Sequence, residues 1–533
     1  MEKSKNKALR ALLSFLMYCA SGMLCALPLL IPSLWIIGWA APAPVLFCEL
    51  SQKREKDSYV CAYLRGMSFF WFFGVVVFYW FSELYPLDFL GFTTSEALIT
   101  VILATCGIPL LQAIVPAFGF VFICFVRKRS FCKFHPVLSS LLFASIFVLG
   151  EFSNTLTWAG VPWGKMAVGQ VGFLPIVQSA SLFGSYFITF IMIFAASLLA
   201  LSVSSATKKE RKRAIIFASA ALMVFLSNLV FGAVKMAIPE MCEDKITVAA
   251  LQGNIRFEDK WADKEGHTME VYERLSKEAS DKGADLILWP ETAIPYDYSY
   301  NWRMSVFYDD LASYTDSEII VTSFESEGDK LYNTARLLYS DGTVSDTVYK
   351  KRHLVPFGEY TPLEELIAAV FPPLAEMSAI EVPLSPGEGT EIMETADGRV
   401  GCLICFDSIY ETLSLESVAD GAELLCISTN DSWFSGSSAL RQHNAQAQLR
   451  AIENNRYIVR SANTGISSII SPKGEIIDSV GDSKEGYAIG DVAYIQERTL
   501  YSLTGNMIVW LSLSFIAFTC VLAFIENKKR DKK

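Results

Sequence analysis

The chain has 533 residues, 52% of them hydrophobic, and a mean hydropathy of +0.34. A chain this apolar is not an ordinary soluble enzyme, and its length leaves room for several domains. Residues 236–505 carry 21 Lys and Arg against 45 Asp and Glu, a net charge of −24, whereas the rest of the chain carries 24 against 11 and is at +13. An acidic soluble block argues against nucleic acid as a partner.

Eight apolar stretches recur along the chain, and most reach the length of about 17–25 residues that crosses a bilayer as a helix. Seven of them precede the acidic block and one follows it. The sequence therefore predicts a membrane bundle over 1–235, a soluble domain over 236–505, and a last span with a basic tail over 506–533. The predicted spans are residues 10–26, 28–48, 66–83, 97–126, 137–153, 181–204, 214–235 and 506–525.

Basic residues gather in alternate loops between these spans, whereas the intervening loops 84–96 and 154–180 carry only Lys165. Cytoplasmic loops of membrane proteins hold an excess of Lys and Arg. We therefore expect both termini to lie in the cytoplasm and the acidic block to lie on the outer side of the membrane. The basic runs begin at Lys3, Lys53, Arg127, Lys208 and Lys528.

Short apolar runs alternate with amphipathic segments in the soluble block, which predicts a layered α/β domain. Several runs are apolar on both faces, as are strands of a buried sheet. Segments 264–281, 302–314 and 438–455 have the pattern of helices. The predicted strands are residues 246–253, 285–291, 319–324, 336–340, 400–407 and 424–431, followed by strands around a Pro-Lys-Gly turn at 472–474.

The stretch 358–390 is irregular and apolar, and it includes the run ELIAAVFPPLAEMSAIEVPL. An apolar stretch beside a membrane suits a lid that touches lipid. A packed insertion is the alternative interpretation.

Three segments of the soluble block each carry one reactive side chain. Glu291 in ILWPETAIP can act as a general base, Lys351 in YKKRHLVPFGEY can stabilise an anion, and Cys405 in GCLICFDSIYE offers a thiol nucleophile. Each also has an ordinary interpretation, as a capping glutamate, a surface lysine or an inert core cysteine. Lys350 is the alternative for the amine. Because Cys402 and Cys405 have no second cysteine pair nearby, we expect no zinc site, and no cofactor motif is visible.

Taken together, WPET, then KRHLVPFGEY, then CFD and ISTNDSWF, resemble the Glu–Lys–Cys motifs of the nitrilase, or carbon–nitrogen hydrolase, superfamily. The surrounding spans make the chain similar to the apolipoprotein N-acyltransferase family in particular, and the resemblance covers essentially the whole chain. It implies a nitrilase-like αββα sandwich attached to a multi-span α-helical membrane bundle.

The resemblance also implies an activity. Members of this family transfer an acyl chain from a membrane phospholipid to the N-terminal amine of an S-diacylglyceryl-cysteine lipoprotein, through a thioester on the cysteine and without a cofactor. We expect a monomer in the bacterial cytoplasmic (inner) membrane. The implied roles are general base for Glu291, oxyanion stabiliser for Lys351, nucleophile for Cys405, oxyanion or supporting groups at Phe406, Glu359 and Asp407, and substrate binding by Trp261 and Trp433.

The chain departs from the family beside the thiol, where Cys-Tyr-Glu is replaced by Cys-Phe-Asp. Phe406 keeps a ring and the backbone donor, whereas Asp407 keeps the charge on a shorter arm. Two other functions stay open: an amidase with water as acceptor, and a lipid-binding scaffold without activity. A transporter is disfavoured because the interiors of the predicted spans carry no charges, and Glu151 stands near the edge of its span.

Overall fold

The computed structural model describes residues 2–50, 57–87, 91–129, 131, 135–239, 244–255, 266–295, 297, 302–372, 383–434 and 436–530. The chain divides into two compact units. The helical unit comprises Met1–Ser82, Ile102–Ile238 and Asn506–Lys533, and the α/β unit comprises Glu83–Val101 and Pro239–Gly505.

The apolar stretches of the sequence form helices, because a backbone in lipid must satisfy its hydrogen bonds within its own segment. Eight segments among the described residues are long and apolar enough to cross a membrane, and each overlaps one of the eight predicted stretches, the third being shifted toward the N-terminus, at Tyr59–Val77. The main helices are α1 (Glu2–Leu30), α4 (Tyr59–Val77), α5 (Thr94–Ile102), α6 (Ile108–Lys128), α8 (Pro136–Ser153), α10 (Ser185–Thr207), α11 (Arg211–Ala237) and α20 (Met507–Arg530).

Two of the predicted spans are interrupted. The second is made of a 3-10 turn at Pro32–Leu34, α2 (Ile37–Ala40) and α3 (Ala43–Leu50). The fourth is interrupted by a π-helical segment at Leu103–Gly107, directly before Pro109. A proline has no N–H to donate to the preceding turn, so the break at this place has a local cause.

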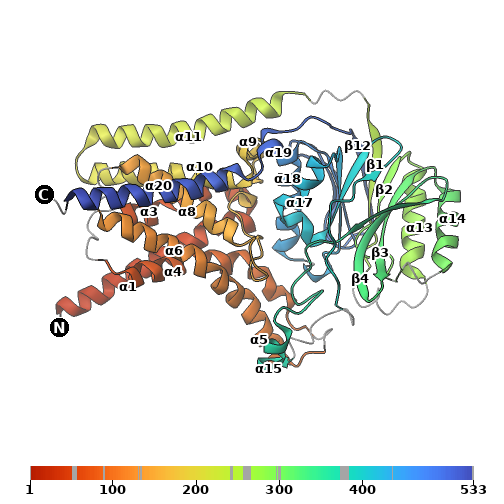
Figure 1. The fold of residues 1–533 in the computed structure, drawn as a ribbon, viewed down its shortest axis with the longest axis horizontal. Helices are drawn as coiled ribbons and strands as arrows, with labels where there is room; N and C mark the ends of the chain where they lie inside the picture. Colours follow the sequence, from red (N-terminus) through yellow and green to blue (C-terminus); the bar gives the residue numbers. More distant parts are fainter. Residues whose placement is uncertain are drawn as a thin grey trace. The chain divides into compact units, whose positions relative to one another are not determined.

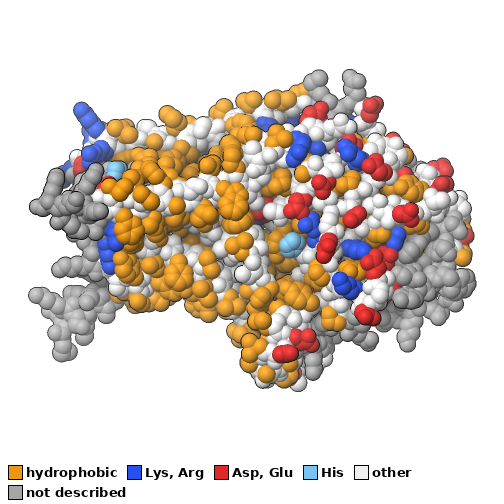
Figure 2. Space-filling model, in the orientation of Figure 1, with side chains coloured by type: hydrophobic (Ala, Val, Ile, Leu, Met, Phe, Trp, Pro, Cys, Tyr) orange, Lys and Arg blue, Asp and Glu red, His pale blue; other side chains and the backbone are white. Residues whose placement is uncertain are grey.

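Hydrophobic side chains cover the visible face of the helical unit, whereas charged side chains are scattered over that of the α/β unit (Figure 2). Val60, Met223 and Trp510 are among the exposed apolar side chains of the helices, at 67%, 70% and 61% exposure. Exposed apolar surface on this scale fits contact with lipid.

The α/β unit contains two six-stranded sheets, with the orders β12-β1-β2-β3-β4-β5 and β11-β10-β9-β8-β7-β6. Each sheet has three parallel strands at its centre, β1-β2-β3 and β7-β8-β9, flanked by antiparallel ones. The strands are β1 (Ile246–Gln252), β2 (Leu286–Leu288), β3 (Glu318–Glu327), β4 (Lys330–Leu338), β5 (Val344–Lys350), β6 (Met393–Glu394), β7 (Arg399–Ile404), β8 (Leu424–Thr429), β9 (Ile458–Ala462), β10 (Ser467–Ile470), β11 (Ile476–Val480) and β12 (Gly486–Val492).

The two sheets pack face to face, and helices cover their outer faces (Figure 1). Helices α13 (His267–Ser280) and α14 (Trp302–Tyr314) lie on the first sheet, and α17 (Glu411–Ala419) and α18 (Ser438–Asn454) lie on the second. Val248 and Ala250 of β1 join the core between the sheets, whereas Ala249 and Leu251 join the core under α13. This alternation explains why the central strands are apolar on both faces.

The predicted architecture, a helical membrane part with an αββα domain, is confirmed. The three predicted helices of the block correspond to α13, α14 and α18. The predicted strand 285–291 is wrong in length, because β2 ends at Leu288 and Pro290 cannot donate to a ladder. Strand β4 begins at Lys330, six residues earlier than expected, and α17 was not foreseen.

Candidate active site

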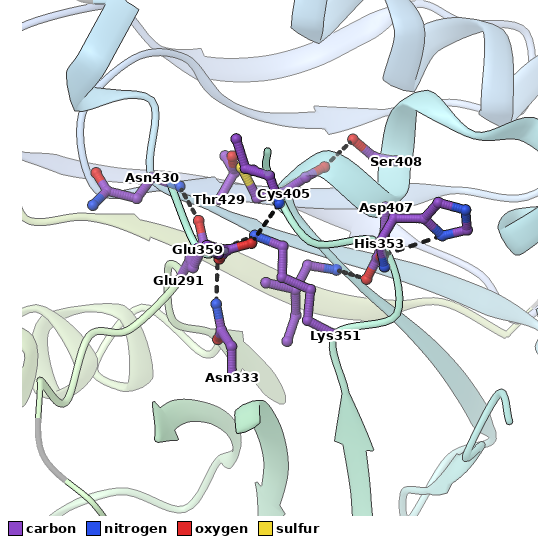
Figure 3. A network of polar contacts seen from close by, with 12 residues as sticks. Glu291, Asn333, Lys351, His353, Glu359, Cys405, Asp407, Ser408, Thr429 and Asn430 are labelled. Atoms are coloured by element: carbon purple, nitrogen blue, oxygen red, sulfur yellow. Dashed lines mark hydrogen bonds and ion pairs between the residues drawn. The ribbon is translucent and has the colours of Figure 1, made fainter. Parts of the chain in front are cut away.

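The three reactive side chains of the sequence meet between the two sheets (Figure 3). Glu291 follows β2 and Lys351 follows β5, both in the first sheet, whereas Cys405 follows β7 in the second. Side chains at the carboxyl ends of parallel strands are a common place for a site in α/β proteins. The fold thus brings together residues that are separated by more than fifty positions in the sequence.

Lys351 is fully enclosed and lies between two carboxylates. Its Nζ donates to Glu291 Oε1 at 2.8 Å and to Glu359 Oε1 at 2.8 Å, and only 1% of the lysine side chain is exposed. Burial acts to lower the pKa of Lys351, but the charges of Glu291 and Glu359 outweigh it and hold the pKa well above its ordinary value. The site therefore contains one permanent positive charge and two carboxylates, one more than is required to balance it.

Glu291 is oriented by two further donors. Asn333 Nδ2 donates to its Oε1 at 2.8 Å, and the backbone N–H of Asn430 donates to its Oε2 at 3.0 Å. Asn333 was missed by the sequence analysis, because the predicted strand began at 336 and left this position outside. Its only signal is an amide side chain three residues before the start of the predicted strand.

The backbone at Cys405 is held in a conformation that side chains rarely adopt. Its φ is 49°, in the left-handed region, where β7 turns sharply into the 3-10 turn Cys405–Ile409. Such a conformation costs about 1–3 kcal/mol and persists where the surroundings enforce it, often at functional sites.

The thiol of Cys405 is neutral at rest. Burial, and next the charge of Glu291, raise its pKa above the ordinary value, against the smaller opposite effects of Lys351 and of a hydrogen bond with Thr429. A neutral thiol is a weak nucleophile and needs a neighbouring base to take its proton. Glu291 is the carboxylate placed to do so.

Asp407 supports the backbone around the site. Its buried carboxylate accepts hydrogen bonds from the Tyr349 hydroxyl at 2.8 Å and from the N–H groups of His353 at 2.7 Å and Ile404 at 3.2 Å. It thereby ties the segment after Lys351 to β7, the strand that ends just before Cys405. The shorter arm of the aspartate, a departure from the family pattern, is accommodated by these backbone donors, and burial raises its pKa.

The other predicted supporting residues lie as follows. Glu359 accepts from the N–H of Val355 at 2.8 Å in addition to Lys351. Phe406 is the second residue of the 3-10 turn, where an N–H lacks an intrahelical partner, and its ring packs edge-on against Tyr410 at 5.5 Å. Trp433 is partly exposed in the turn Ser432–Phe434, just beyond Asn430.

Two predictions fall partly or wholly outside the described residues. Trp261 lies outside the described residues, and so do residues 373–382 of the stretch 358–390. Within that stretch, helix α15 (Glu364–Val370) exposes Leu366 at 60% and Val370 at 76%. The lid stays a prediction.

Lys350 and Lys351 point to different surroundings. Lys350 Nζ lies 2.5 Å from Glu327 Oε1, whose side chain is half exposed, and 4.6 Å from the ring of Tyr332. Lys351, and not its neighbour, is therefore the lysine that contacts Glu291.

Comparison with known proteins agrees with this geometry. The carbon–nitrogen hydrolase family model matches residues 247–498, and the model of the apolipoprotein N-acyltransferase N-terminal domain matches residues 21–198. The apolipoprotein N-acyltransferase of Geobacter metallireducens is 29% identical over 96% of this chain and 95% of that protein. That of Haemophilus influenzae is 30% identical over 74% of this chain and 76% of that protein.

Among solved structures, an amidase from Nesterenkonia sp. is 18% identical and covers 49% of this chain and 94% of its own, with a TM-score of 0.36. The resemblance indicated by the sequence motifs is confirmed by the family models and the relatives. This multi-pass membrane protein is an N-acyltransferase, and the chain belongs to the apolipoprotein N-acyltransferase family.

Proposed function

We propose that the chain moves an acyl group from a membrane phospholipid to the N-terminal amine of an S-diacylglyceryl-cysteine lipoprotein, through a thioester on Cys405. The observation that carries this proposal is the enclosed Lys351 with its two carboxylates beside a strained, neutral thiol. That arrangement supplies a nucleophile, a base and a fixed cation in one place. The names of the relatives support the lipoprotein as acceptor.

In the first half-reaction, Glu291 takes the thiol proton as the sulfur of Cys405 attacks the ester carbonyl carbon of the donor. A C–S bond forms and the carbonyl electron pair moves to the oxygen, which Lys351 Nζ and the N–H of Phe406 stabilise. The intermediate collapses, the ester C–O bond breaks, and the proton on Glu291 passes to the departing alkoxide. A lysophospholipid leaves, and the acyl group stays on the sulfur.

In the second half-reaction, the lipoprotein amine attacks the thioester carbonyl carbon. A C–N bond forms, the same two donors stabilise the oxyanion, and the C–S bond breaks. The amine proton passes through Glu291 to the sulfur, which restores the neutral thiol. The energy of the acyl bond comes from the donor ester, so the cycle needs no nucleotide.

In this scheme Glu359, the second carboxylate, balances the charge of Lys351 when Glu291 is protonated. When Glu291 carries the proton, it no longer neutralises Lys351, and a buried cation without a counter-charge is unfavourable. Glu359, at 2.8 Å from Nζ, remains as its partner. Glu359 therefore keeps Lys351 charged throughout the cycle.

Both substrates of this reaction are anchored in the bilayer, which restricts their search and orients them. We place the protein in the inner membrane as a monomer, with the catalytic domain 236–505 on the periplasmic side and both termini in the cytoplasm. The bundle 1–235 and the last span 506–533 would hold the domain at the lipid surface. The alternating basic loops and the acidic block support this orientation.

A transfer assay with a matched pair of cysteine variants tests the function. Purified protein is incubated with phospholipid vesicles and a diacylated lipopeptide, and N-acyl peptide is measured for Cys405→Ala and Cys402→Ala. Cys402 lies in β7, three residues before Cys405, and is buried, and burial raises its pKa to about 12. We expect transfer to be lost in the first variant and kept in the second. Transfer by Cys405→Ala, or release of free fatty acid without N-acyl peptide, would contradict the proposal, and the latter result indicates an amidase-like hydrolase.

A further inference from the structure

A second polar network contacts the carbonyl oxygen of the peptide that joins Cys405 to Phe406. Ser408 Oγ donates to the carbonyl oxygen of Cys405 at 2.7 Å (Figure 3). His443 Nε2 lies 3.0 Å from Ser408 Oγ and 3.4 Å from the same carbonyl oxygen. His443 is 1% exposed and Ser408 is fully buried. The reaction scheme above uses neither residue.

Two charged groups anchor the far side of the histidine. Asp431 Oδ1 lies 2.9 Å from His443 Nδ1, and Arg460 Nη2 lies 2.7 Å from Asp431 Oδ2. Burial acts to raise the pKa of Asp431, but Arg460 and His443 outweigh it and hold the pKa below its ordinary value. The imidazole is therefore fixed by an ionised carboxylate that is itself paired.

The hydrogen bonds dictate where the protons lie. A carbonyl oxygen can only accept, so Ser408 must give its single proton to Cys405. The hydroxyl oxygen can then only accept, so its contact with His443 is a hydrogen bond when Nε2 carries a proton. The result is a directed chain, from Nε2–H through the hydroxyl to the carbonyl of Cys405.

This carbonyl shares its peptide plane with the N–H of Phe406. The peptide is planar and trans, so its C=O and N–H point in opposite directions. Donors that fix the carbonyl on one side also fix the direction of the N–H on the other. They polarise the peptide as well, and a polarised amide is a stronger donor.

We propose that Ser408 and His443 are positioning residues that orient and polarise the Cys405–Phe406 peptide, so that the N–H of Phe406 stabilises the oxyanion. This inference rests on the proposed function, in which that N–H contacts the reacting oxygen. The network also accounts for how the left-handed backbone at Cys405 is maintained, because Asp407 holds the N–H of Ile404 while Ser408 and His443 hold the carbonyl.

Ser408, His443 and Asp431 have the residue types of a serine hydrolase triad, but Ser408 is not a second nucleophile. Its proton is committed to the carbonyl of Cys405, and its side chain has no exposed surface. A substrate carbonyl has no access to that oxygen.

Two reactions of the Cys405 sulfur, acylation and alkylation, distinguish an effect on the N–H of Phe406 from a general effect on the thiol. Thioester formation from phosphatidylethanolamine vesicles passes through an oxyanion, whereas alkylation by iodoacetamide is a direct displacement without one. We expect Ser408→Ala to slow thioester formation by about tenfold, and to leave alkylation within about twofold. Ser417→Ala is the matched control, because this buried serine also donates to a backbone carbonyl, that of Leu413, without contacting the site.

A second pair of variants tests the histidine. A glutamine can place an amide N–H near the position of Nε2, whereas an asparagine reaches only the position of Nδ1. We expect His443→Gln to retain more of the thioester formation rate than His443→Asn, with alkylation alike in both. Rates are expressed per Cys405 that reacts with iodoacetamide, so that a partly misfolded variant is still informative.

The inference would be overturned if Ser408→Ala formed the thioester as fast as the Ser417→Ala control, or if acylation and alkylation fell together. Equal acylation rates in the two histidine variants would also contradict it. Failure of the proposed function itself gives a different result, since transfer would then persist in Cys405→Ala.

Discussion

Two buried clusters of charge, one at Glu49 in the helical unit and one at Lys351 in the α/β unit, differ in balance. In the helical unit, Glu49 lies 2.7 Å from Arg65 and 2.7 Å from Arg127, and Asp57 lies 2.9 Å from Arg127. Two acids therefore face two arginines, which never lose their charge. In the α/β unit, Glu291 and Glu359 share the single cation Lys351.

The difference indicates which cluster can do chemistry. A balanced cluster of arginine pairs has no reason to exchange protons, and its breakage leaves a buried charge unpaired. A cluster with an excess carboxylate has one group that can accept a proton while the cation keeps its partner. We therefore assign a structural role to the cluster at Glu49 and proton transfer to the cluster at Glu291.

Removal of the Glu291 carboxylate should have the largest effect on the rate of thioester formation. Glu291→Gln keeps the shape of the side chain but cannot accept the thiol proton, so we expect thioester formation to fall by about 10³-fold. The variant should still be recovered in the membrane fraction. Single-turnover acylation of Cys405 measures the change, and a rate within tenfold of the parent protein would show that another group is the base.

The two adjacent lysines should respond differently. Lys351→Met removes the cation from the oxyanion and leaves two buried carboxylates without their counter-charge, so we expect the transfer rate to fall by about 10²-fold or more. Lys350→Met loses the ion pair with Glu327 and the contact with the ring of Tyr332, and should stay within about twofold. Steady-state transfer assays on both variants check this expectation, which would be wrong if Lys350→Met were the weaker enzyme.

The donors that orient the base should matter less than the base. Asn333→Ala removes one hydrogen bond to Glu291 without changing its charge. We expect thioester formation to slow by about tenfold, since an uncharged donor to a carboxylate contributes about 1.5–3 kcal/mol. An unaffected rate would show that the N–H of Asn430 and Lys351 are sufficient to hold Glu291.

The pH dependence of alkylation tests the protonation state of the thiol. Because the pKa of Cys405 lies above its ordinary value of 9.0, the thiolate fraction should grow with pH throughout the range below 9. The rate of alkylation by iodoacetamide should therefore rise up to pH 9 without levelling off. A plateau near neutral pH would indicate a thiolate at rest, and Glu291 would then not be needed as a base.

Disruption of the balanced cluster should have the smallest effect on catalysis. Glu49→Gln leaves Arg65 and Arg127 with less negative charge to face, so we expect a lower midpoint of thermal unfolding. Transfer activity per folded molecule should remain within about twofold of the parent protein. Loss of activity without loss of stability would assign this cluster a role in the reaction.

The sequence was sufficient to predict candidate site residues that lie in long, continuous motifs. Glu291, Lys351 and Cys405 each stand in such a segment, whereas the choice between Lys350 and Lys351 came from their contacts in the structure. The spans were predictable because lipid imposes the same requirement on every backbone group.

The partners of these residues were not predictable. Asn333 contacts Glu291 through the pairing of β3 with β4, and His443 reaches Cys405 from helix α18, so both contacts depend on tertiary packing. The donors to Asp407 were hidden for the same reason, because they come from the segment after Lys351 as well as from the strand before Cys405.

The thioester on Cys405 is the central element of the scheme, and mass spectrometry detects it directly. The purified protein is incubated with phospholipid alone, digested, and the peptide that contains Cys405 is weighed before and after addition of a diacylated lipopeptide. We expect one acyl group on Cys405, which leaves the protein and appears on the N-terminus of the lipopeptide. An unmodified Cys405, or an acyl group that stays on it while N-acyl peptide forms, would contradict the mechanism.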